Sequence, residues 1–487
     1  MADFGFVGVS YEAPSIYQNA QECINYYPEV DPTKQPGDRG IVALYPTPGL
    51  VQEVQLAVGE VRGMRALSGG QYLLAVSGNI VYSITNAFVA TQIGTLTTSS
   101  GQVSISDNVT TTKGLTAYIV DGPNRYTWVA ATNTFATLPA TDGPWQGANV
   151  VEVVDNYNIY NQPGTQNWAC TDLGSSLSTN ALYGVKDGSP DNLVSILVDR
   201  RQVYLLGEVT SEVWTDVGNI VTGIISFPFQ RIPGTSAQHG CAAPFSVARF
   251  SESFIFVAKD TRGNSTIEKI EGYTFVKIST HAVEQTLIGV EISDAIAYTY
   301  QIEGHEFYVV TFPSINLTWV YDEATQAWHK WLAWDNGQFF RHRGNCAAYF
   351  SNQNLVGDFE NGKIYSLQND VYTDNGATIR RLRRAPHLTS DLQRQYFDEL
   401  QIQFQPGVGL SVGQGDDPQA MLRWSNDGGS TWSNEHWVSI GKIGRYQNRA
   451  IWRRLGWSRD RIFEVVITDP IKAVIISANL KASTGEN

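Results

Sequence analysis

The chain has 487 residues, 42% of them hydrophobic and 17% charged, and a formal net charge of −13. This length allows two or three domains, or one large array of β repeats with an appendage, and ample burial of a core. The acidic balance argues against a general nucleic-acid-wrapping protein, which is normally basic. Abundant glycine (44 residues), tyrosine (23) and tryptophan (13) favour strands and tight turns over helices, so we predict an all-β protein.

Residues 1–60 are rich in proline, glycine and tyrosine, which predicts an extended N-terminal arm that is able to close a ring. The first residues lack the basic stretch and apolar core of a secretory signal. No apolar run approaches the ~20 residues needed to span a membrane. We therefore expect a soluble chain, made in a reducing cytosol, without membrane insertion.

Internal repetition marks residues 61–376. Strand-rich units with glycine, asparagine and aspartate turns begin near Gly69, Gly114, Ala148, Asn192, Ala243, Ile292 and Gly344. A spacing of roughly 35–50 residues with four short strands per unit is typical of propeller blades. The sequence predicts a β-propeller of six or seven blades, with stacked β-sandwiches as the alternative.

Local signals inside the repeats are consistent with that architecture. Residues 71–77 and 80–84 flank Gly78-Asn79, which is a two-residue hairpin signal. Only one short helix stands out, at residues 281–287, with Thr280 placed to act as its N-cap.

Residues 377–487 form a predicted second, C-terminal β region with a different charge. Between residues 377 and 461 there are 13 Lys/Arg and 8 Asp/Glu, a net charge of +5, so the remainder of the chain carries −18. Arginine forks bind carboxylates and phosphates at interfaces. We therefore predict a docking surface for an acidic partner, with a merely solvated face as the alternative. Its candidate residues are Arg380, Arg381, Arg383, Arg384, Arg445, Arg449, Arg453 and Arg454.

One motif in this region has a defined local structure. Ser425, Asp427, Gly429 and Trp432 match Ser-x-Asp-x-Gly-x-x-Trp, the Asp-box hairpin familiar from sialidases and other β-propeller proteins. Glycines in the turn supply positive φ angles, and the tryptophan folds back over it. The motif is a structural device of enzymes and non-enzymes alike. Five of the 13 tryptophans lie between residues 424 and 457, which predicts a compact aromatic core.

No catalytic constellation is recognisable. A sialidase needs an arginine triad, a Tyr-Glu pair, an acid and usually several Asp-boxes, whereas this chain has one Asp-box. The seven histidines are scattered, and Cys23, Cys170, Cys241 and Cys346 form no Cys-x-x-Cys pair. We predict no catalytic, metal or cofactor site. A glycosidase stays open as the alternative, because sequence alone cannot show two carboxyls ~5.5 Å apart.

Short motifs in a fixed order carry a family resemblance. They are residues 23–29 (CINYYPE), 45–50 (YPTPGL), 278–284 (ISTHAVE), 304–308 (GHEFY), 318–322 (TWVYD), 356–358 (VGD), 372–376 (YTDNG), the Asp-box, 452–456 (WRRLG) and 468–470 (TDP). With them the chain resembles the packaged-DNA stabilisation proteins, or tail hub/nozzle proteins, of short-tailed bacteriophages. The resemblance runs nearly end to end.

The resemblance implies a structural role in the virion tail, after assembly in the bacterial host cytoplasm. Such proteins form a hexamer beneath the portal-adaptor ring, extend its channel, retain packaged DNA, and carry the tail needle or tip and the fibres or spikes. The family has no established catalytic residues, so none can be assigned to this chain, and we expect no cofactor. An acidic subunit suits a channel through which double-stranded DNA slides without sequence-specific binding, since each neutralised phosphate adds affinity.

Two alternatives remain at this stage: a sialidase-like propeller glycosidase, and a glycan-binding receptor module, which would expose tryptophans from the 424–457 cluster. We also expect the hexamer to form only on its template, because the sequence shows no large self-complementary apolar patch outside the strands.

Overall fold

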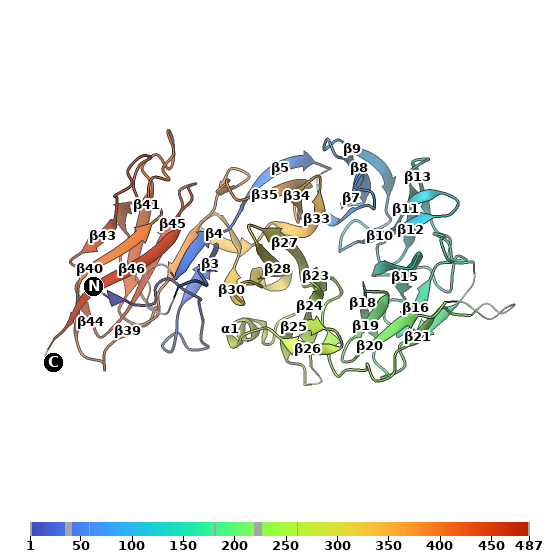
Figure 1. Cartoon of the computed structure of the whole chain (residues 1–487), viewed down its shortest axis with the longest axis horizontal. Helices are drawn as coiled ribbons and strands as arrows, with labels where there is room; N and C mark the ends of the chain where they lie inside the picture. The colour runs from blue at the N-terminus through green and yellow to red at the C-terminus, as the bar shows by residue number, and fades with distance from the viewer. Residues whose placement is uncertain are drawn as a thin grey trace.

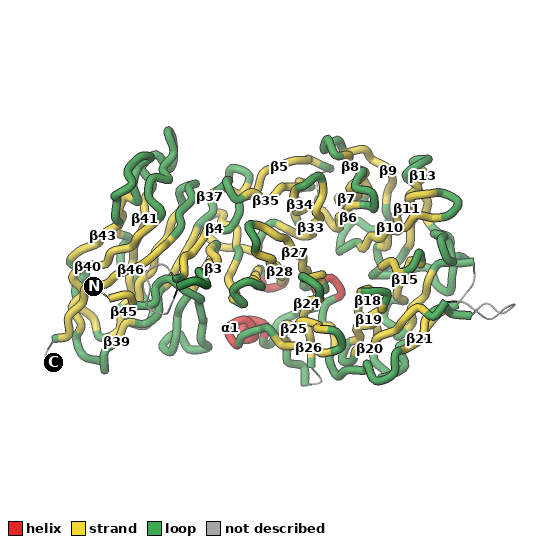
Figure 2. The backbone as a smooth tube through the Cα atoms, in the orientation of Figure 1, coloured by secondary structure: helices red, strands yellow, loops and turns green. Residues whose placement is uncertain are grey.

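The computed structural model describes residues 2–34, 41–57, 59–179, 182–218, 226–260 and 262–485. It is all-β, with a ring of seven sheets joined to a β-sandwich at one side (Figure 1). Among the described residues the single α-helix is α1 (His281–Glu284), and strands and loops make up nearly all the rest (Figure 2). The prediction of an all-β protein with a propeller of six or seven blades is confirmed, and the described residues form seven blades.

The first four blades each use four strands in chain order. Blade 1 contains β6 (Val61–Ala66), β7 (Tyr72–Ser77), β8 (Ile80–Thr85) and β9 (Ala90–Thr95). Blade 2 contains β10 (Ser104–Thr110), β11 (Gly114–Val120), β12 (Arg125–Val129) and β13 (Thr134–Thr137). Blade 3 contains β14 (Val151–Val154), β15 (Tyr157–Asn161), β16 (Asn167–Cys170) and β17 (Tyr183–Val185). Blade 4 contains β18 (Leu193–Asp199), β19 (Gln202–Gly207), β20 (Ser211–Asp216) and β21 (Phe229–Arg231).

The remaining three blades complete the circle. Blade 5 contains β22 (Gly240–Cys241), β23 (Ala248–Phe250), β24 (Ser253–Lys259), β25 (Ser265–Glu271) and β26 (Thr274–Lys277). Blade 6 contains β27 (Ile296–Ile302), β28 (His305–Phe312), β29 (Leu317–Asp322) and β30 (Ala327–Lys330). After the hairpin of β31 (Leu332–Asp335) and β32 (Gln338–Arg341), blade 7 contains β33 (Gly344–Phe350), β34 (Gln353–Asp358) and β35 (Lys363–Gln368).

The outer strand of blade 7 comes from the other end of the chain. Strand β5 (Gly49–Gln55) pairs antiparallel with β35, from Gly49 opposite Gln368 to Gln55 opposite Lys363. The short strands β36 (Thr373–Asp374) and β37 (Ala377–Thr378) extend the same sheet. Gly49 is needed here, because a Cβ would lie 2.4 Å from the Val371 carbonyl oxygen. The N-terminal segment thus closes the ring.

Hydrophobic clusters lie between neighbouring blades around the ring. Between blades 1 and 2, for example, Leu74 and Val76 pack with Ile119 and Trp128. Successive apolar side chains of each strand alternate between the two faces of its sheet, and both faces are covered by the adjoining blades. Because both faces are buried, the strands of each repeat appear in the sequence as short continuous apolar runs.

The local predictions can be compared with these elements. Gly78-Asn79 does form the turn between β7 and β8, with Gly78 at a positive φ of 55°. The predicted helix at residues 281–287 is one α-turn, α1, followed by a 3-10 turn, Gln285–Leu287. Thr280 is its N-cap, but its side chain makes no cap bond.

The C-terminal region is a β-sandwich that incorporates N-terminal strands. One sheet has the order β3 (Tyr26–Val30), β4 (Val42–Pro46), β46 (Ile475–Thr484), β40 (Gln395–Phe404) and β43 (Ala450–Arg453), with β1 (Ala2–Asp3) beside β46 and β44 (Trp457–Ser458) beside β40. The other has β2 (Glu22–Ile24), β38 (Arg381–Arg384), β45 (Asp460–Ile467), β41 (Gln419–Ser425) and β42 (His436–Ser439), with β39 (Leu388–Thr389) beside β45.

The core of the sandwich is mainly aliphatic. Phe6 and Leu44 from the N-terminal segment pack with Leu400, Phe463 and Ile475 from the C-terminal one. The predicted compact tryptophan core is wrong. Of the five tryptophans between residues 424 and 457 only Trp452 is fully buried, while Trp437 and Trp457 are 61% and 50% exposed. Trp437 lies on β42, an edge strand that pairs with β41 alone in the described structure.

The propeller and the sandwich share one continuous sheet. Strand β30 of blade 6 pairs in parallel with β2, and β2 pairs antiparallel with β38 of the sandwich. Residues 22–46 thus supply strands to the sandwich and residues 49–55 a strand to the propeller. The division into an arm (1–60), a propeller (61–376) and a C-terminal region (377–487) remains our proposal for the folding units.

Candidate functional site

The junction between propeller and sandwich carries a ladder of alternating charges, which we call the junction ladder. Its members are Glu12, Lys330, Glu22, Arg384, Glu464 and Arg423. The last five lie on the successive neighbouring strands β30, β2, β38, β45 and β41. Cross-strand register places Glu22 opposite Arg384, Arg384 opposite Glu464, and Glu464 opposite Arg423. Opposite charges facing each other on adjacent strands are a stabilising arrangement.

The distances in the ladder are those of direct ion pairs. The Lys330 Nζ lies 2.8 Å from Glu12 and 3.0 Å from Glu22. Arg384 reaches Glu22 at 3.1 Å and the fully buried Glu464 at 2.8 Å. Burial raises the pKa of Glu12 although Lys330 opposes it. Burial also opposes ionisation of Glu22, but Lys330 and Arg384 outweigh it and lower the pKa of Glu22.

The Asp-box covers the outer end of the ladder. Its turn is fixed by Ser425, whose hydroxyl lies 2.7 Å from Asp427 and accepts the Gly429 amide at 2.8 Å. Asp427 accepts the Thr431 hydroxyl and amide, and these bonds lower the pKa of Asp427 to about 2. Trp432 then lies under two ladder arginines, Arg384 at 5.0 Å and Arg423 at 4.7 Å from its ring.

The N-terminal arm packs against the same hairpin. A Cβ at Gly428, which has a φ of +69°, would lie 2.6 Å from the Tyr17 ring. The Tyr17 and Ser430 hydroxyls are 3.3 Å apart. The Asp-box therefore positions both the arm and the ladder, which fits the structural role proposed for it.

The first arginine set lies largely inside the molecule. Arg381 and Arg383 are fully buried, so they are not available to a partner, contrary to the predicted docking surface. Arg383 donates to the Phe6 carbonyl at 2.7 Å. Arg384 belongs to the junction ladder, and Arg380 is half-buried over the Trp334 ring. The reason is that β38 is an interior strand with both faces covered.

The second arginine set is exposed. Arg445, Arg449, Arg453 and Arg454 all lie on the surface of the sandwich. Arg453 pairs with Glu399 at 2.8 Å. In the part of the chain that the structure describes, the side chains of Arg445, Arg449 and Arg454 have no ion pair. For these four residues the docking role remains a prediction.

The propeller encloses a central cavity of about 460 Å³. It is lined by the inner strands of all seven blades. Its charged residues are Arg62, Arg65, Glu152 and Arg249, and burial raises the pKa of Glu152. The Arg62 guanidinium is occupied by the carbonyls of residues 78, 98, 100 and 101. Among the described lining residues Glu152 is the one carboxylate, so the cavity does not favour a two-carboxylate glycosidase.

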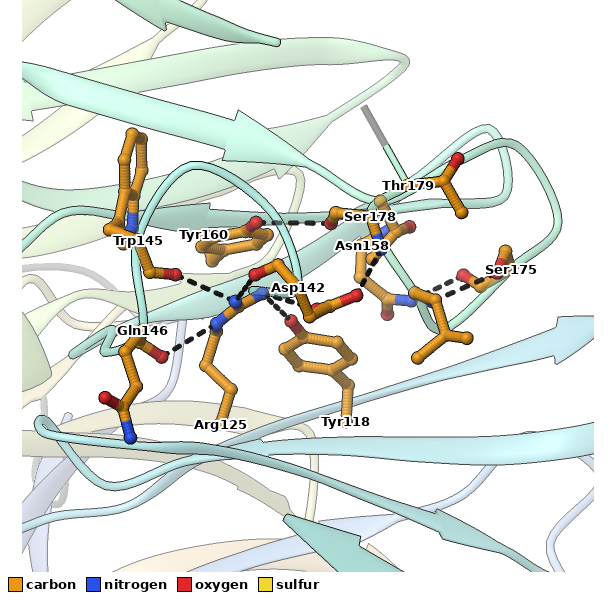
Figure 3. Close-up of polar contacts among 12 residues, drawn as sticks. Tyr118, Arg125, Asp142, Trp145, Gln146, Asn158, Tyr160, Ser175, Ser178 and Thr179 are labelled. Atoms are coloured by element: carbon orange, nitrogen blue, oxygen red, sulfur yellow. Dashed lines mark hydrogen bonds and ion pairs between the residues drawn. The ribbon is translucent and has the colours of Figure 1, made fainter. Parts of the chain in front are cut away.

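Another buried cation fixes the connection between blades 2 and 3 (Figure 3). The Arg125 guanidinium donates to the Tyr118 hydroxyl at 2.7 Å, to Asp142 at 3.2 Å and to the Gln146 and Trp145 carbonyls. Asp142 also accepts the Ser178 amide at 2.9 Å. Every N–H group of Arg125 has an acceptor, either in the loop or at Tyr118 of β11, which indicates a loop anchor and not a reactive site. In the sequence, one arginine in an otherwise apolar strand is the single signal for this anchor.

Two further observations concern sites of other kinds. Within the described residues, no group of three His, Cys, Asp or Glu side chains is arranged to hold a metal ion. No helix in that part of the chain is long and apolar enough to cross a membrane. The four cysteines are free, and burial raises the pKa of Cys170, Cys241 and Cys346 to about 12.

Comparison with known proteins identifies the family. The family model of the Bacteriophage P22 Gp10 beta-propeller matches residues 21–372, and that of the Gp10 beta-sandwich matches residues 380–483. No curated protein is similar enough in sequence to count as a relative. Among solved structures, the N-terminal domain of Nup159 is 11% identical with a TM-score of 0.41, over 70% of this chain and 98% of that one, and at that score the likeness carries no argument. The resemblance seen in the sequence is confirmed: the chain belongs to the Bacteriophage P22 Gp10 family of phage DNA-stabilisation and tail proteins, built from a β-propeller and a C-terminal β-sandwich.

Proposed function

We propose that the chain is a tail hub or nozzle subunit. Six copies assemble beneath the portal-adaptor ring, extend and close its DNA channel, and anchor the tail needle or tip and the fibres or spikes. The observation that carries this proposal is the match of both Gp10 family models, in order, over residues 21–372 and 380–483.

The junction supports a role as a rigid bracket. A subunit that joins a channel to tail attachments has to hold its two parts in a fixed geometry. Here one sheet runs from blade 6 through β2 into the sandwich, and the junction ladder crosses the same strands. A flexible linker between the two parts would allow domain motion, whereas a continuous sheet opposes it.

The negative net charge is consistent with a channel through which DNA moves without being bound tightly. A net charge of −13 disfavours tight phosphate binding, so that DNA can pass without being held along the wall.

The proposal is tested by adding the purified chain to DNA-filled, tail-less heads that carry portal and adaptor, and imaging them by cryo-EM. We expect a sixfold ring that continues the channel, and less DNA release on warming. Heads without the adaptor serve as the control and should stay bare. Bare adaptor-bearing heads, with the chain folded, would contradict the hub role.

A glycan-binding role is the second candidate, and one observation favours it. Trp437 and Trp457 are half or more exposed, and Arg394 lies 4.8 Å over the Trp457 ring. Exposed tryptophans present flat apolar faces. If this role is correct, host surface glycans will quench tryptophan fluorescence in the wild type and not in the Trp437→Ala, Trp457→Ala double variant. No quenching of the wild type would exclude it.

A further inference from the structure

One end of the sandwich exposes an apolar and basic surface, which we call the basic tip. It is formed by two packed loops, residues 405–418 between β40 and β41 and residues 440–449 between β42 and β43. Its exposed apolar and basic side chains are Leu410, Val412, Lys442, Ile443, Arg445, Tyr446 and Arg449. Asp416 is exposed as well and Asp417 is half-buried, so the two loops carry a net charge of +1, from three Lys/Arg and two Asp. Val412 is 79% exposed and Tyr446 is 71% exposed.

The two loops of the tip hold each other in place. A Cβ at Gly407 would lie 2.6 Å from the Tyr446 ring, and one at Gly409 would lie 2.9 Å from the Ile443 amide nitrogen. The apolar side chains are therefore displayed on an ordered support. Within the described residues none of the tip cations makes an ion pair, so their charge is available to a partner.

A second exposed apolar set lies on blade 3, and we call it the blade-3 edge. Strand β17 is the outermost strand of its sheet and pairs with β16 alone in the described structure. Leu173, Leu177, Tyr183 and Val185 are exposed along this strand and the loop before it. An exposed apolar edge strand is a template for association. Blades 3 and 4, residues 151–231, contain 9 Asp/Glu and 4 Lys/Arg, so the surroundings are acidic.

The two surfaces cannot meet within one chain. The sandwich is attached to blade 6, and blade 3 lies across the ring from it, at the opposite end of the elongated molecule (Figure 1). The shared sheet at the junction holds them apart.

We propose that the basic tip of one copy docks on the blade-3 edge of the next copy. Both surfaces are apolar, and their charges are opposite. Because the two surfaces differ, the contact is heterologous, and repetition of such a contact closes a ring when the rotation fits. This proposal deepens the proposed function, because it names the contact between neighbouring subunits of the hub.

The composition of the tip favours a protein partner over DNA. Phosphate contacts come from lysine, arginine and polar groups. The tip instead surrounds its cations with Leu410, Val412 and Ile443, which desolvate well only against another apolar surface. Each patch exposes four large apolar side chains, whereas a stable complex uses about 20–30 residues from each partner. The contact is therefore weak in free solution, in keeping with assembly on a template.

Photo-crosslinking tests the contact. A benzophenone amino acid replaces Tyr446 in the full chain, which is irradiated at high concentration and also when bound to adaptor-bearing heads. We expect crosslinks between copies that join position 446 to residues 171–187, identified by mass spectrometry. Tyr183→Lys should lower their yield roughly tenfold, since it removes an aromatic anchor and adds a like charge. The matched control Val109→Lys, at an exposed position on blade 2, should not.

Other outcomes separate this contact from the hub role. Crosslinks to the adaptor, to DNA or to another segment, or no crosslinks in either sample, overturn the proposed contact. If the chain still forms a sixfold ring on the heads, the hub role stands without it. If the chain does not bind the heads, the hub role fails, and the crosslinks of the purified chain still decide the contact.

Discussion

At the scale of single residues, Asn25 joins the propeller to the sandwich. Its side-chain amide donates to the Leu332 and Arg380 carbonyls, each at 2.8 Å, and its side-chain oxygen accepts the Leu332 amide at 2.8 Å. Its φ is +59°, a conformation that asparagine tolerates better than most residues. One side chain thus satisfies backbone groups at the start of β31, just after blade 6, and at the residue before β38.

Replacing Asn25 with alanine should therefore destabilise the protein strongly. Three buried hydrogen bonds are lost and the backbone is strained, so we expect the free energy of unfolding to fall by about 3 kcal/mol or more. Urea denaturation measures it. Asn25→Gly also removes the three hydrogen bonds, but glycine adopts a positive φ without strain, so this variant should lose less stability than Asn25→Ala. Asn336→Ala, at an exposed residue also with positive φ, is the control. A loss at Asn25 no greater than at Asn336 would contradict the bridging role.

A second residue-scale prediction concerns pH and His305. Hydrogen bonding to Asp322, and then to Glu29 of β3, raises the pKa of His305 to about 9. A histidine whose pKa is higher in the folded protein than its usual value of about 6.5 stabilises the fold. This stabilisation is fully present below pH 6.5 and is lost as the pH rises through 9. The wild type should thus lose about 2 kcal/mol of stability between pH 6.5 and 9.5, a figure reduced from the full shift because Glu29 is partly exposed.

The measurement is the difference between wild type and His305→Gln across that range. Other titrating groups cancel in this difference. A difference that stays constant with pH would show that the imidazole is neutral in the folded protein.

At the scale of elements, the junction ladder predicts that the stability of the fold depends strongly on Lys330. Without the Lys330 ammonium group, Glu12 would lose the cation that it pairs with and Glu22 would keep only Arg384, in a mostly buried site. Breaking a buried ion pair costs about 3 kcal/mol or more. Lys330→Met should destabilise the protein by that order in chemical denaturation, and Glu12→Gln with Glu22→Gln added should restore much of the loss. Lys113→Met, at an exposed lysine, should have little effect. Failure of the glutamines to rescue would mean that the ladder is not the cause.

The elements also show what the sequence could and could not predict. Blades were predictable, because each is made of neighbouring strands whose turns, such as Gly78-Asn79, carry local signals. The sandwich strands β2 and β4 were not, because β2 pairs with β30 and β38, and β4 with β46, hundreds of residues away in the chain. Strand β3 joins the sandwich through β4. Arg381 and Arg383 were wrongly predicted to be exposed for the same reason: the residues that bury them lie far away in the sequence. Charged side chains are rarely buried unless they have polar partners, and here Phe6, Gln21 and Asp469 supply them from remote segments.

At the scale of the whole molecule, the chain folds back so that its two ends make one domain. Phe6, Cys23, Tyr26 and Leu44 belong to the core of the sandwich together with residues after 385. Strand β5 then enters the propeller, and the chain returns to the sandwich only after seven blades. The folding of each part therefore depends on segments that the other part separates.

This arrangement predicts that the propeller and the sandwich unfold together. Opening the sandwich would expose β2, which is paired with blade 6, and opening blade 7 would release β5, which precedes the first blade. We expect one calorimetric transition for the full chain.

Residues 377–487 expressed alone should stay unfolded, because they lack β2, β3, β4 and the apolar side chains that these strands contribute. Adding residues 1–46 through a flexible linker should recover strand content by circular dichroism. Two separate transitions, or a folded 377–487 fragment, would mean that the sandwich is independent and that the shared sheet is only a surface contact.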